Sequence, residues 1–389
     1  MRTVGTIARG IRTPLIKAGD DMASIVVDSV LAAAAQEQFE LRDRDVIGIT
    51  EAVVARAQGN YATSAQISAD IRQKFPGGTL ALTFPILSRN RFYALKGITQ
   101  GCDKLYIVLS YPADEVGNEL ISWDMIDAAG VNPYTDVLTE ADYREKFGYD
   151  IRHVFTGIDY VEYYKSFGDH VEILFANDVR RVLDFTQHVL CCDIHSLARS
   201  KRLLQAAGAQ TVFGLDDVLS APVQGSGYNE TYGLLGSNKA TDDSIKLFPR
   251  DCDVLVNTIA QKMKAATGKH IEVMIYGDGA FKDPVGKIWE LADPVVSPGF
   301  TPGLHGTPNE LKLKLMLDNE FAGKSDEEVR AAMDAAIKGK SATLGDQALG
   351  TTPRYYTDLL GSLCDLVSGS GDKGTPVVLV QGYFDNYAS

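Results

Sequence analysis

Cysteine is scarce in this chain and is not arranged as a metal site or a disulfide framework. Only five cysteines occur among 389 residues, and only Cys191 and Cys192 lie close together in the sequence. No C-x-x-C pair is present, which argues against a structural zinc site or a set of structural disulfides. The sequence therefore predicts a protein of the reducing cytoplasm.

Long apolar runs are also absent. No segment has about 18 consecutive apolar residues, the length that a membrane-spanning helix needs. The first residues, M-R-T-V-G-T-I-A-R-G, lack the apolar core and the cleavage site of a secretory signal. We therefore expect no association with a membrane.

Basic residues are not in excess. The chain has 38 lysines and arginines against 51 acidic residues, which gives a formal net charge of −13. A sequence-independent nucleic-acid surface needs a basic stripe, so nucleic acid is not an expected partner. Small anionic substrates remain compatible with this charge, because a bound cation can invert the local field.

Several common catalytic and nucleotide-binding motifs are missing. The sequence contains no G-x-x-x-x-G-K-[ST], G-x-S-x-G or H-E-x-x-H pattern. The amino-acid composition is typical of a folded soluble protein, with 45% hydrophobic and 23% charged residues. The length is sufficient for about two to three domains.

The hydrophobic pattern predicts a mixture of helices and strands. Apolar residues recur at helical spacing over 22–35, and a capping box, Ser325 to Glu328, opens another helix. Residues 44–54 fit a turn that enters a buried strand. Strands and helices alternate over 80–110 and 171–213, as in an α/β module. Further helices are expected over 63–75, 254–267 and 355–367, and strands over 271–276 and 376–380. The polar segment 112–167 has no clear pattern, and the predicted fold class is α+β, a mixed α/β arrangement.

Two acidic sites stand out in the second half of the chain. Asp242, Asp243 and Ser244 follow small residues in a predicted loop, and Asp278 ends the apolar strand V-M-I-Y-G. Carboxylates on a loop and at a strand end commonly hold a hard cation such as Mg²⁺ beside phosphates. The alternative is that both sites are ordinary solvated turns. Together they favour a metal-dependent enzyme that acts on a nucleotide or a phosphorylated intermediate.

Two further groups of polar residues allow two interpretations each. Gly19, Asp20 and Asp21 precede the first predicted helix, and they fit either a helix cap or an anion site at the helix N-terminus. Asp193 and His195 follow a predicted strand of the α/β module. The histidine fits either a catalytic base or a hydrogen-bonded edge residue.

Five segments carry patterns that occur together in one enzyme family. The first two are I-R-T-P-L-I-K-A-G-D-D-M, Ile11–Met22, and R-D-V-I-G-I-T-E-A-V-V-A-R-A-Q-G-N, Arg44–Asn60. The central one, Tyr232–Ile245, fits H-G-x-x-x-A-N-A-G-x-D-x-S-N without a gap. The last two lie at 278–281 and over 357–382. In this ordered set the chain resembles the coenzyme F-420-0:L-glutamate ligases, the γ-glutamyl ligases of coenzyme F-420 biosynthesis.

The resemblance implies a ligase with small-molecule substrates. In the family, a nucleoside triphosphate phosphorylates an acceptor carboxylate, and an amino acid, typically L-glutamate, then attacks the acyl phosphate to give an amide. The nucleotide is GTP in the family, with ATP as the alternative here, and the expected cations are Mg²⁺ or Mn²⁺, with K⁺ as a further candidate. The resemblance also implies a homodimer.

The same resemblance suggests roles for individual residues. Asp242 and Asp278 are expected to bind the divalent metal. Asp243 and Arg56 are the expected catalytic residues, with Arg56 in the place of a family lysine near the phosphates. The nucleotide or acceptor site is expected to be formed by Gly19, Asp20, Asp21, Asn238 and Ser244.

The family core is shorter than this chain, which predicts insertions. The ligase-like core is expected at 1–80, 221–294 and 351–389. An α/β module is inserted at 81–220, and a second insertion with a helix occupies 295–350.

Several positions depart from the family pattern. Tyr232 stands in place of a histidine, Ala52 in place of a lysine, and Gly279 in place of a hydroxyl residue. These departures leave two alternatives open. One is a nucleotide- or metabolite-binding homologue without ligase activity, and the other is an enzyme whose site lies in the inserted module.

Overall fold

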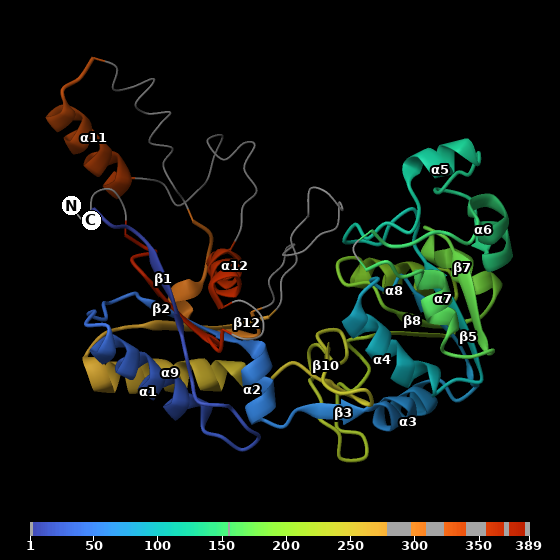
Figure 1. Ribbon diagram of the computed structural model, residues 1–389, viewed down its shortest axis with the longest axis horizontal. Helices are drawn as coiled ribbons and strands as arrows, with labels where there is room; N and C mark the ends of the chain where they lie inside the picture. The colour runs from blue at the N-terminus through green and yellow to red at the C-terminus, as the bar shows by residue number, and fades with distance from the viewer. Residues whose placement is uncertain are drawn as a thin grey trace.

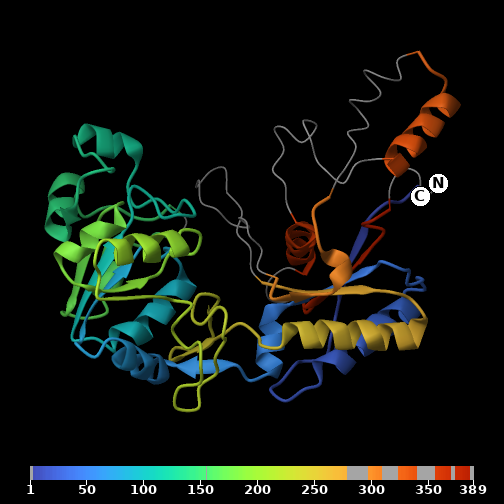
Figure 2. The ribbon, with the colours of Figure 1, turned by 180° about the vertical axis from the view of Figure 1, so that it is seen from behind.

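The residues that the structure describes form three β-sheets, arranged along the length of the molecule. The computed structural model describes residues 3–154, 156–277, 297–308, 323–339, 355–368 and 373–385. A five-stranded sheet lies at one end and a six-stranded sheet at the other, and a small three-stranded sheet connects them (Figures 1 and 2). The predicted fold class, α+β, is confirmed.

The five-stranded sheet is assembled from distant parts of the sequence. Strands β2 and β12 are parallel, and the other neighbours are antiparallel. In spatial order the strands are β1 (Ile7–Ile11), β14 (Val377–Gln381), β2 (Val46–Thr50), β12 (Glu272–Tyr276) and β13 (Gly299–Phe300).

Helices cover both faces of this sheet (Figure 1). Helices α1 (Met22–Gln36) and α9 (Cys252–Thr267) pack on one face, and α12 (Tyr356–Ser368) packs on the other. Successive strand residues point to opposite faces, so Ile47 joins the first core while Val46 joins the second. The short η2 (Pro302–Leu304) adds Leu304 to the core on the α12 face, whereas α11 (Asp326–Gly339) lies apart from the sheet (Figure 1).

Strand β2 is shorter than the sequence predicted. Within 44–54, where a turn that enters a strand is expected, the strand ends at Thr50 and helix α2 (Glu51–Ala57) begins at the next residue. The acidic Glu51 occupies the first turn, where the positive end of the helix dipole favours a carboxylate. Val54 and Ala57 pack into the core of the five-stranded sheet, which stabilises the helix although its β-branched residues favour a strand.

The six-stranded sheet forms the predicted α/β module. In spatial order its strands are β6 (Leu138–Thr139), β7 (Val171–Phe175), β5 (Lys104–Leu109), β4 (Thr79–Thr83), β8 (His188–Cys191) and β9 (Thr211–Gly214). All neighbours are parallel except the pair β6 and β7. Helices α3 (Ser64–Lys74), α4 (Arg89–Thr99) and α7 (Tyr160–Lys165) cover one face, and α8 (Leu197–Ala206) with η1 (Val179–Asp184) covers the other.

The order of the parallel strands reverses in the middle of this sheet. Strand β4 comes first in the chain, β5 and β7 lie on one side of it, and β8 and β9 lie on the other. The carboxyl ends of β4 and β8 therefore border a topological switch point. Open α/β sheets commonly bind ligands in the crevice at such a point.

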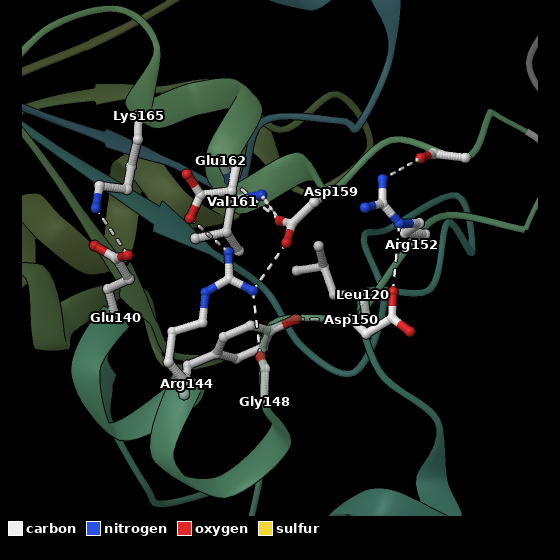
Figure 3. A network of polar contacts seen from close by, with 12 residues as sticks. Leu120, Glu140, Arg144, Gly148, Asp150, Arg152, Asp159, Val161, Glu162 and Lys165 are labelled. Atoms are coloured by element: carbon white, nitrogen blue, oxygen red, sulfur yellow. Dashed lines mark hydrogen bonds and ion pairs between the residues drawn. The ribbon is translucent and has the colours of Figure 1, made fainter.

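The segment 112–167, which had no sequence assignment, contains short capped helices. Helix α6 (Glu140–Phe147) follows α5 (Trp123–Ala128) and precedes α7. The buried Arg144 of α6 forms ion pairs with Asp159 at 2.9 Å and with Glu162 at 3.0 Å (Figure 3). Because Asp159 also caps α7, this arginine joins the two helices.

The two large sheets are connected by two adjacent chain segments. Strands β3 (Tyr61–Thr63), β11 (Ser244–Lys246) and β10 (Asn238–Lys239) form the small sheet between them. Asn60 Nδ2 donates hydrogen bonds to the carbonyl oxygens of Tyr228 at 3.0 Å and Phe248 at 2.6 Å. The outgoing and returning segments are therefore fixed to each other.

The predicted division into a core, an inserted module and a second insertion stays a prediction. The capping box at Ser325 is confirmed, since Ser325 N donates to Glu328 Oε2 at 2.9 Å and Glu328 N donates to Ser325 Oγ at 3.4 Å. Among the residues that the structure describes, no helix combines the length and the apolar character needed to cross a membrane.

Candidate active site

A buried carboxylate lies at the carboxyl end of the parallel strands β2 and β12. Glu51 is only 1% exposed and directly follows Thr50, the last residue of β2. Thr50 pairs with Tyr276, the last residue of β12, so Glu51 lies beside the end of both strands. Active-site groups commonly occupy this edge of α/β sheets. Glu51 was not among the predicted site residues because it falls inside the predicted strand, although an acid within an apolar run was a signal.

Asn238 connects Glu51 to the six-stranded half of the molecule. Its Nδ2 donates to Glu51 Oε1 at 3.1 Å, and its Oδ1 accepts a hydrogen bond from Asn90 Nδ2 at 2.8 Å. Asn90 Oδ1 in turn accepts from the backbone N–H of Lys239 at 3.1 Å. Strand β10 thus lies between α2 and α4 (Figure 1), and the structure brings Asn238 to the buried carboxylate.

The predicted metal ligand Asp242 lies on the solvent-exposed turn between β10 and β11. Its side chain is 91% exposed, and it forms an ion pair with Lys239 at 2.8 Å. The hydrogen bond from Lys239 holds the pKa of Asp242 below its usual value. Lys96 of α4 donates to the backbone carbonyl of Asp242 at 3.2 Å, and Lys239 lies 3.8 Å from the ring centre of Tyr93. Helix α4 therefore supports this loop.

The neighbouring residues of the loop have structural contacts. The backbone carbonyl of Asp243 accepts from Ser64 N at 3.0 Å, while its side chain is exposed. The Ser244 hydroxyl lies 2.7 Å from that of Thr241. Asp242 and Asp243 thus lie in the turn between β10 and β11, and Ser244 is the first residue of β11.

Other predicted site residues lie elsewhere. Asp21 caps α1 by accepting from Ser24 N at 3.2 Å, and the Ser24 hydroxyl bond holds the pKa of Asp21 low. Asp20 accepts from Lys17 N at 2.7 Å. Gly19 N donates to the Ala57 carbonyl at 2.8 Å, at the opposite end of α2 from Glu51. Asp21 is thus the N-cap of α1, and a ligand role for Gly19, Asp20 and Asp21 stays a prediction.

The last two predicted site residues are Arg56 and Asp278. Arg56 is exposed and lies about 140° around α2 from Glu51, since each helical residue turns by about 100°. Asp278 lies outside the described residues. Within the described ranges, no group of three or more His, Cys, Asp or Glu side chains is arranged to hold a metal ion.

A cavity of about 340 Å³ opens beside the N-terminus of α9. Arg250 lines it and is fixed by a hydrogen bond to the Tyr228 carbonyl at 3.2 Å. Tyr232, at the position of the family histidine, packs edge-on against Phe248, and burial raises its pKa so that the hydroxyl stays neutral. Burial, together with the nearby carboxylates that include Glu51, raises the pKa of Cys252 in the cavity wall to about 12.

Asp193 in the six-stranded half is expected to make stability depend on pH. Burial raises its pKa to about 6, and Glu115 adds to the rise, while Ser200 and Arg91 oppose it. The folded state therefore retains this proton between about pH 4 and 6, and stability falls as pH rises through that window. A rise of this size corresponds to roughly 3 kcal/mol. Asp193→Asn should lack this loss. The unfolding free energy of the variant minus that of the wild type should therefore rise by about 2–3 kcal/mol from pH 4 to pH 7.

Urea unfolding at several pH values measures that difference. Asp216→Asn is the matched control, because Asp216 is a partly exposed partner of Lys201 in the same half. A difference between Asp193→Asn and the wild type that stays constant with pH would contradict the expectation.

A comparison with known proteins identifies the family of this chain. A family model described as F420-0:Gamma-glutamyl ligase matches residues 10–382, nearly the whole chain and including the six-stranded half. No curated protein sequence matches significantly. The resemblance of the five segments is therefore confirmed, and the protein is a ligase that forms amide C–N bonds. The chain belongs to the F420-0:γ-glutamyl ligase family.

Proposed function

We propose that this protein is a nucleotide- and divalent-metal-dependent ligase that joins an amino acid, L-glutamate in the first instance, to a small carboxylate acceptor. The observation that carries the proposal is Glu51, a buried carboxylate at the end of two parallel strands in a chain that matches the family from residue 10 to 382. Asn238, a residue of the family pattern, donates to it.

The proposed reaction has two steps. An oxygen of the acceptor carboxylate attacks the terminal phosphorus of the nucleotide, and the nucleoside diphosphate leaves. The amino nitrogen then attacks the carbonyl carbon of the acyl phosphate, inorganic phosphate leaves, and the nitrogen loses a proton. GTP is the first candidate nucleotide, and ATP is the second. Acyl phosphates hydrolyse readily, so a buried carboxylate such as Glu51 suits the water-poor site that this chemistry needs.

The candidate cation ligands are all hard oxygen donors. Glu51 and Asp242 would hold Mg²⁺ or Mn²⁺, ions that bind through a few carboxylates and complete their coordination with phosphates and water. When bound, the cation neutralises charge on the transferred phosphoryl group. Asp278 remains a predicted third ligand on its sequence position, and K⁺ remains a further candidate. Asp243 and Ser244 would support the loop.

Arg250 and the cavity beside α9 would accept the phosphates of the nucleotide together with a bound cation, because Glu230, Asp251 and Asp253 line the same cavity. The guanidinium is a fixed cation, and the first turn of α9 presents backbone N–H groups at the positive end of the helix dipole. The cavity volume of about 340 Å³ suits a polyphosphate rather than a whole nucleotide. We further propose the homodimer, the cytoplasmic location and the division into core and insertions that the resemblance implies.

The activity is tested with the purified full-length protein. GTP or ATP, Mg²⁺ or Mn²⁺ and L-glutamate are combined with a panel of small carboxylic acids, and phosphate release and product mass are measured. We expect phosphate release that requires metal and acceptor, and a product equal to acceptor plus amino acid minus water. Nucleotide binding without phosphate release across the panel would favour the non-catalytic homologue.

A further inference from the structure

An asparagine of helix α4 contacts two consecutive residues of β10. Asn90 is the second residue of α4. Its Oδ1 accepts a hydrogen bond from the backbone N–H of Lys239 at 3.1 Å, and its Nδ2 donates to Asn238 Oδ1 at 2.8 Å. Asn238 Nδ2 in turn donates to Glu51 Oε1 at 3.1 Å. Three partly buried hydrogen bonds therefore run in series from a backbone N–H to the buried carboxylate.

The backbone N–H fixes the orientation of the Asn90 amide. Strand β10 is an edge strand of the three-stranded sheet, so backbone groups on its outer side have no strand partner. The N–H of Lys239 can only donate, and of the two ends of the Asn90 amide only the oxygen can accept. The NH₂ group of Asn90 must then face Asn238.

This orientation is passed on to Asn238. Because the NH₂ group of Asn90 can only donate, it requires the oxygen of Asn238, which turns the Asn238 NH₂ group toward Glu51. In the opposite orientation the Asn238 oxygen would face a carboxylate oxygen, and two acceptors in contact repel each other. Glu51 is 1% exposed, so water has little access to relieve that repulsion. The series of bonds thus selects one orientation of Asn238.

The position of Asn90 is fixed by the packing of α4. Ser88 caps the helix, since its Oγ accepts from Arg91 N at 3.2 Å. At Gly97 a Cβ atom would lie 2.9 Å from the side chain of Ile67, so α4 packs closely against α3. A helix held in this way gives Asn90 a defined position beside β10. The six-stranded half therefore contributes to the arrangement of the candidate active site.

We propose that Asn90 is a positioning residue for the ligase reaction: it sets the orientation of the Asn238 amide, and through that amide it holds the Glu51 carboxylate in place. The inference rests on the proposed function, in which Glu51 belongs to the active site. Asn90 touches no substrate in this role. It lies within 81–220, the segment predicted to be an insertion, so that segment would contribute to catalysis in the ligase-like core.

Steady-state kinetics of full-length variants tests this role. Asn90→Asp keeps the shape of the side chain and an acceptor for the Lys239 N–H but offers no donor to Asn238, and Asn90→Leu removes both groups. Each should lower kcat for acceptor-dependent phosphate release by at least about tenfold, because the Glu51 carboxylate is no longer held in place. The KM for nucleotide and for L-glutamate should change by less than about threefold, since Asn90 touches neither.

Two further proteins show whether the effect passes through Asn238. In an Asn238→Leu background the amide is already missing, so adding Asn90→Leu should lower kcat by less than about twofold more. Asn132→Asp is the matched control, because it is the same substitution at an exposed position of the same half. Asn132 Oδ1 accepts from Tyr134 N at 3.0 Å, and a carboxylate oxygen can do the same, so kcat should stay within about twofold of the wild type.

Urea unfolding tests the contact without any activity. Asn90→Leu leaves the Asn238 oxygen without its donor, and Asn238→Leu leaves the Asn90 NH₂ group without its acceptor. The double variant removes both groups together. Its loss in urea midpoint should therefore be smaller than the sum of the two single losses.

The outcomes separate this inference from the proposed function. An unchanged kcat in folded Asn90→Asp would overturn the positioning role and leave the ligase activity intact. If no acceptor of the panel is ligated, the proposed function fails and the urea midpoints decide on Asn90. Non-additive losses then support its control of the Asn238 amide, and additive losses overturn it.

Discussion

Glu51→Gln is expected to reduce nucleotide-dependent amide formation by on the order of 100-fold or more. The substitution keeps the size of the side chain and a hydrogen-bonding oxygen near Asn238, but it removes a negative charge from a buried position. In a site where charge stabilisation and cation binding carry most of the catalysis, the loss of one charged ligand has effects of this size. The initial rate of phosphate release at saturating nucleotide measures it.

The matched control is Asp45→Asn at the other end of the same strand. Asp45 is also buried, and its carboxylate accepts from Arg42 N at 2.8 Å and from Gln381 Nε2 at 2.7 Å. It lies about 20 Å from Glu51 along β2, given a rise of about 3.3 Å per residue. This variant should keep its activity within about threefold. Full activity in folded Glu51→Gln would remove Glu51 from the proposed mechanism.

The largest effect on stability is expected for Arg144→Met. The Arg144 side chain is 3% exposed and pairs with both Asp159 and Glu162 (Figure 3). Removing it leaves the mostly buried Asp159 without its cation, which typically costs about 3 kcal/mol or more. Because Asp159 also caps α7, the loss should weaken the packing of α6 against α7. Urea unfolding, analysed by linear extrapolation, measures the change.

Arg152→Met is the control in the same segment. Arg152 pairs with Asp150 at 3.4 Å, but the two side chains are 62% and 97% exposed. An exposed pair of this kind contributes little, so the unfolding free energy should change by less than about 0.5 kcal/mol. Equal destabilisation by the two substitutions would show that burial of the Arg144 network does not contribute as expected.

Local sequence signals predicted many of the regular elements. The capping box at Ser325, the helix over 254–267 and the strand over 271–276 all correspond to observed elements. These signals depend only on residues within one or two helical turns along the chain, so they can be read from a single sequence. Within 171–213, where strands and helices are expected to alternate, the segment Val179–Asp184 is a 3₁₀ helix rather than an α-helix.

Two misassignments have physical causes. The predicted end of β2 lies too far along the chain, because β-branched residues continue past Thr50. Packing of α2 on the core makes residues 51–57 helical despite this local preference. The helices of 112–167 were not assigned because they have only six to eight residues. Their ends are fixed by side chains such as Thr139, whose capping box uses Asp142 rather than the more common glutamate.

The candidate site could be predicted only in part. The sequence indicated Asn238 and the acidic turn through the family pattern. It did not indicate that Asn238 contacts Glu51 and Asn90, which are 187 and 148 residues away in the chain. Pairings over such distances depend on how the sheets assemble, and no local pattern encodes them.

The order in which the strands are synthesised has a consequence for how the molecule forms. Strand β2 pairs with β12 and β14, which lie beyond residues 271 and 376, so the central strand of its sheet has neither partner while most of the chain is still being translated. All strands of the six-stranded sheet lie within 79–214, with partners much closer in sequence. Contacts between nearby residues form faster than distant ones. On the ribosome all strands of the six-stranded sheet are therefore present first, and the five-stranded sheet can be completed only after β12 and β14 have been made.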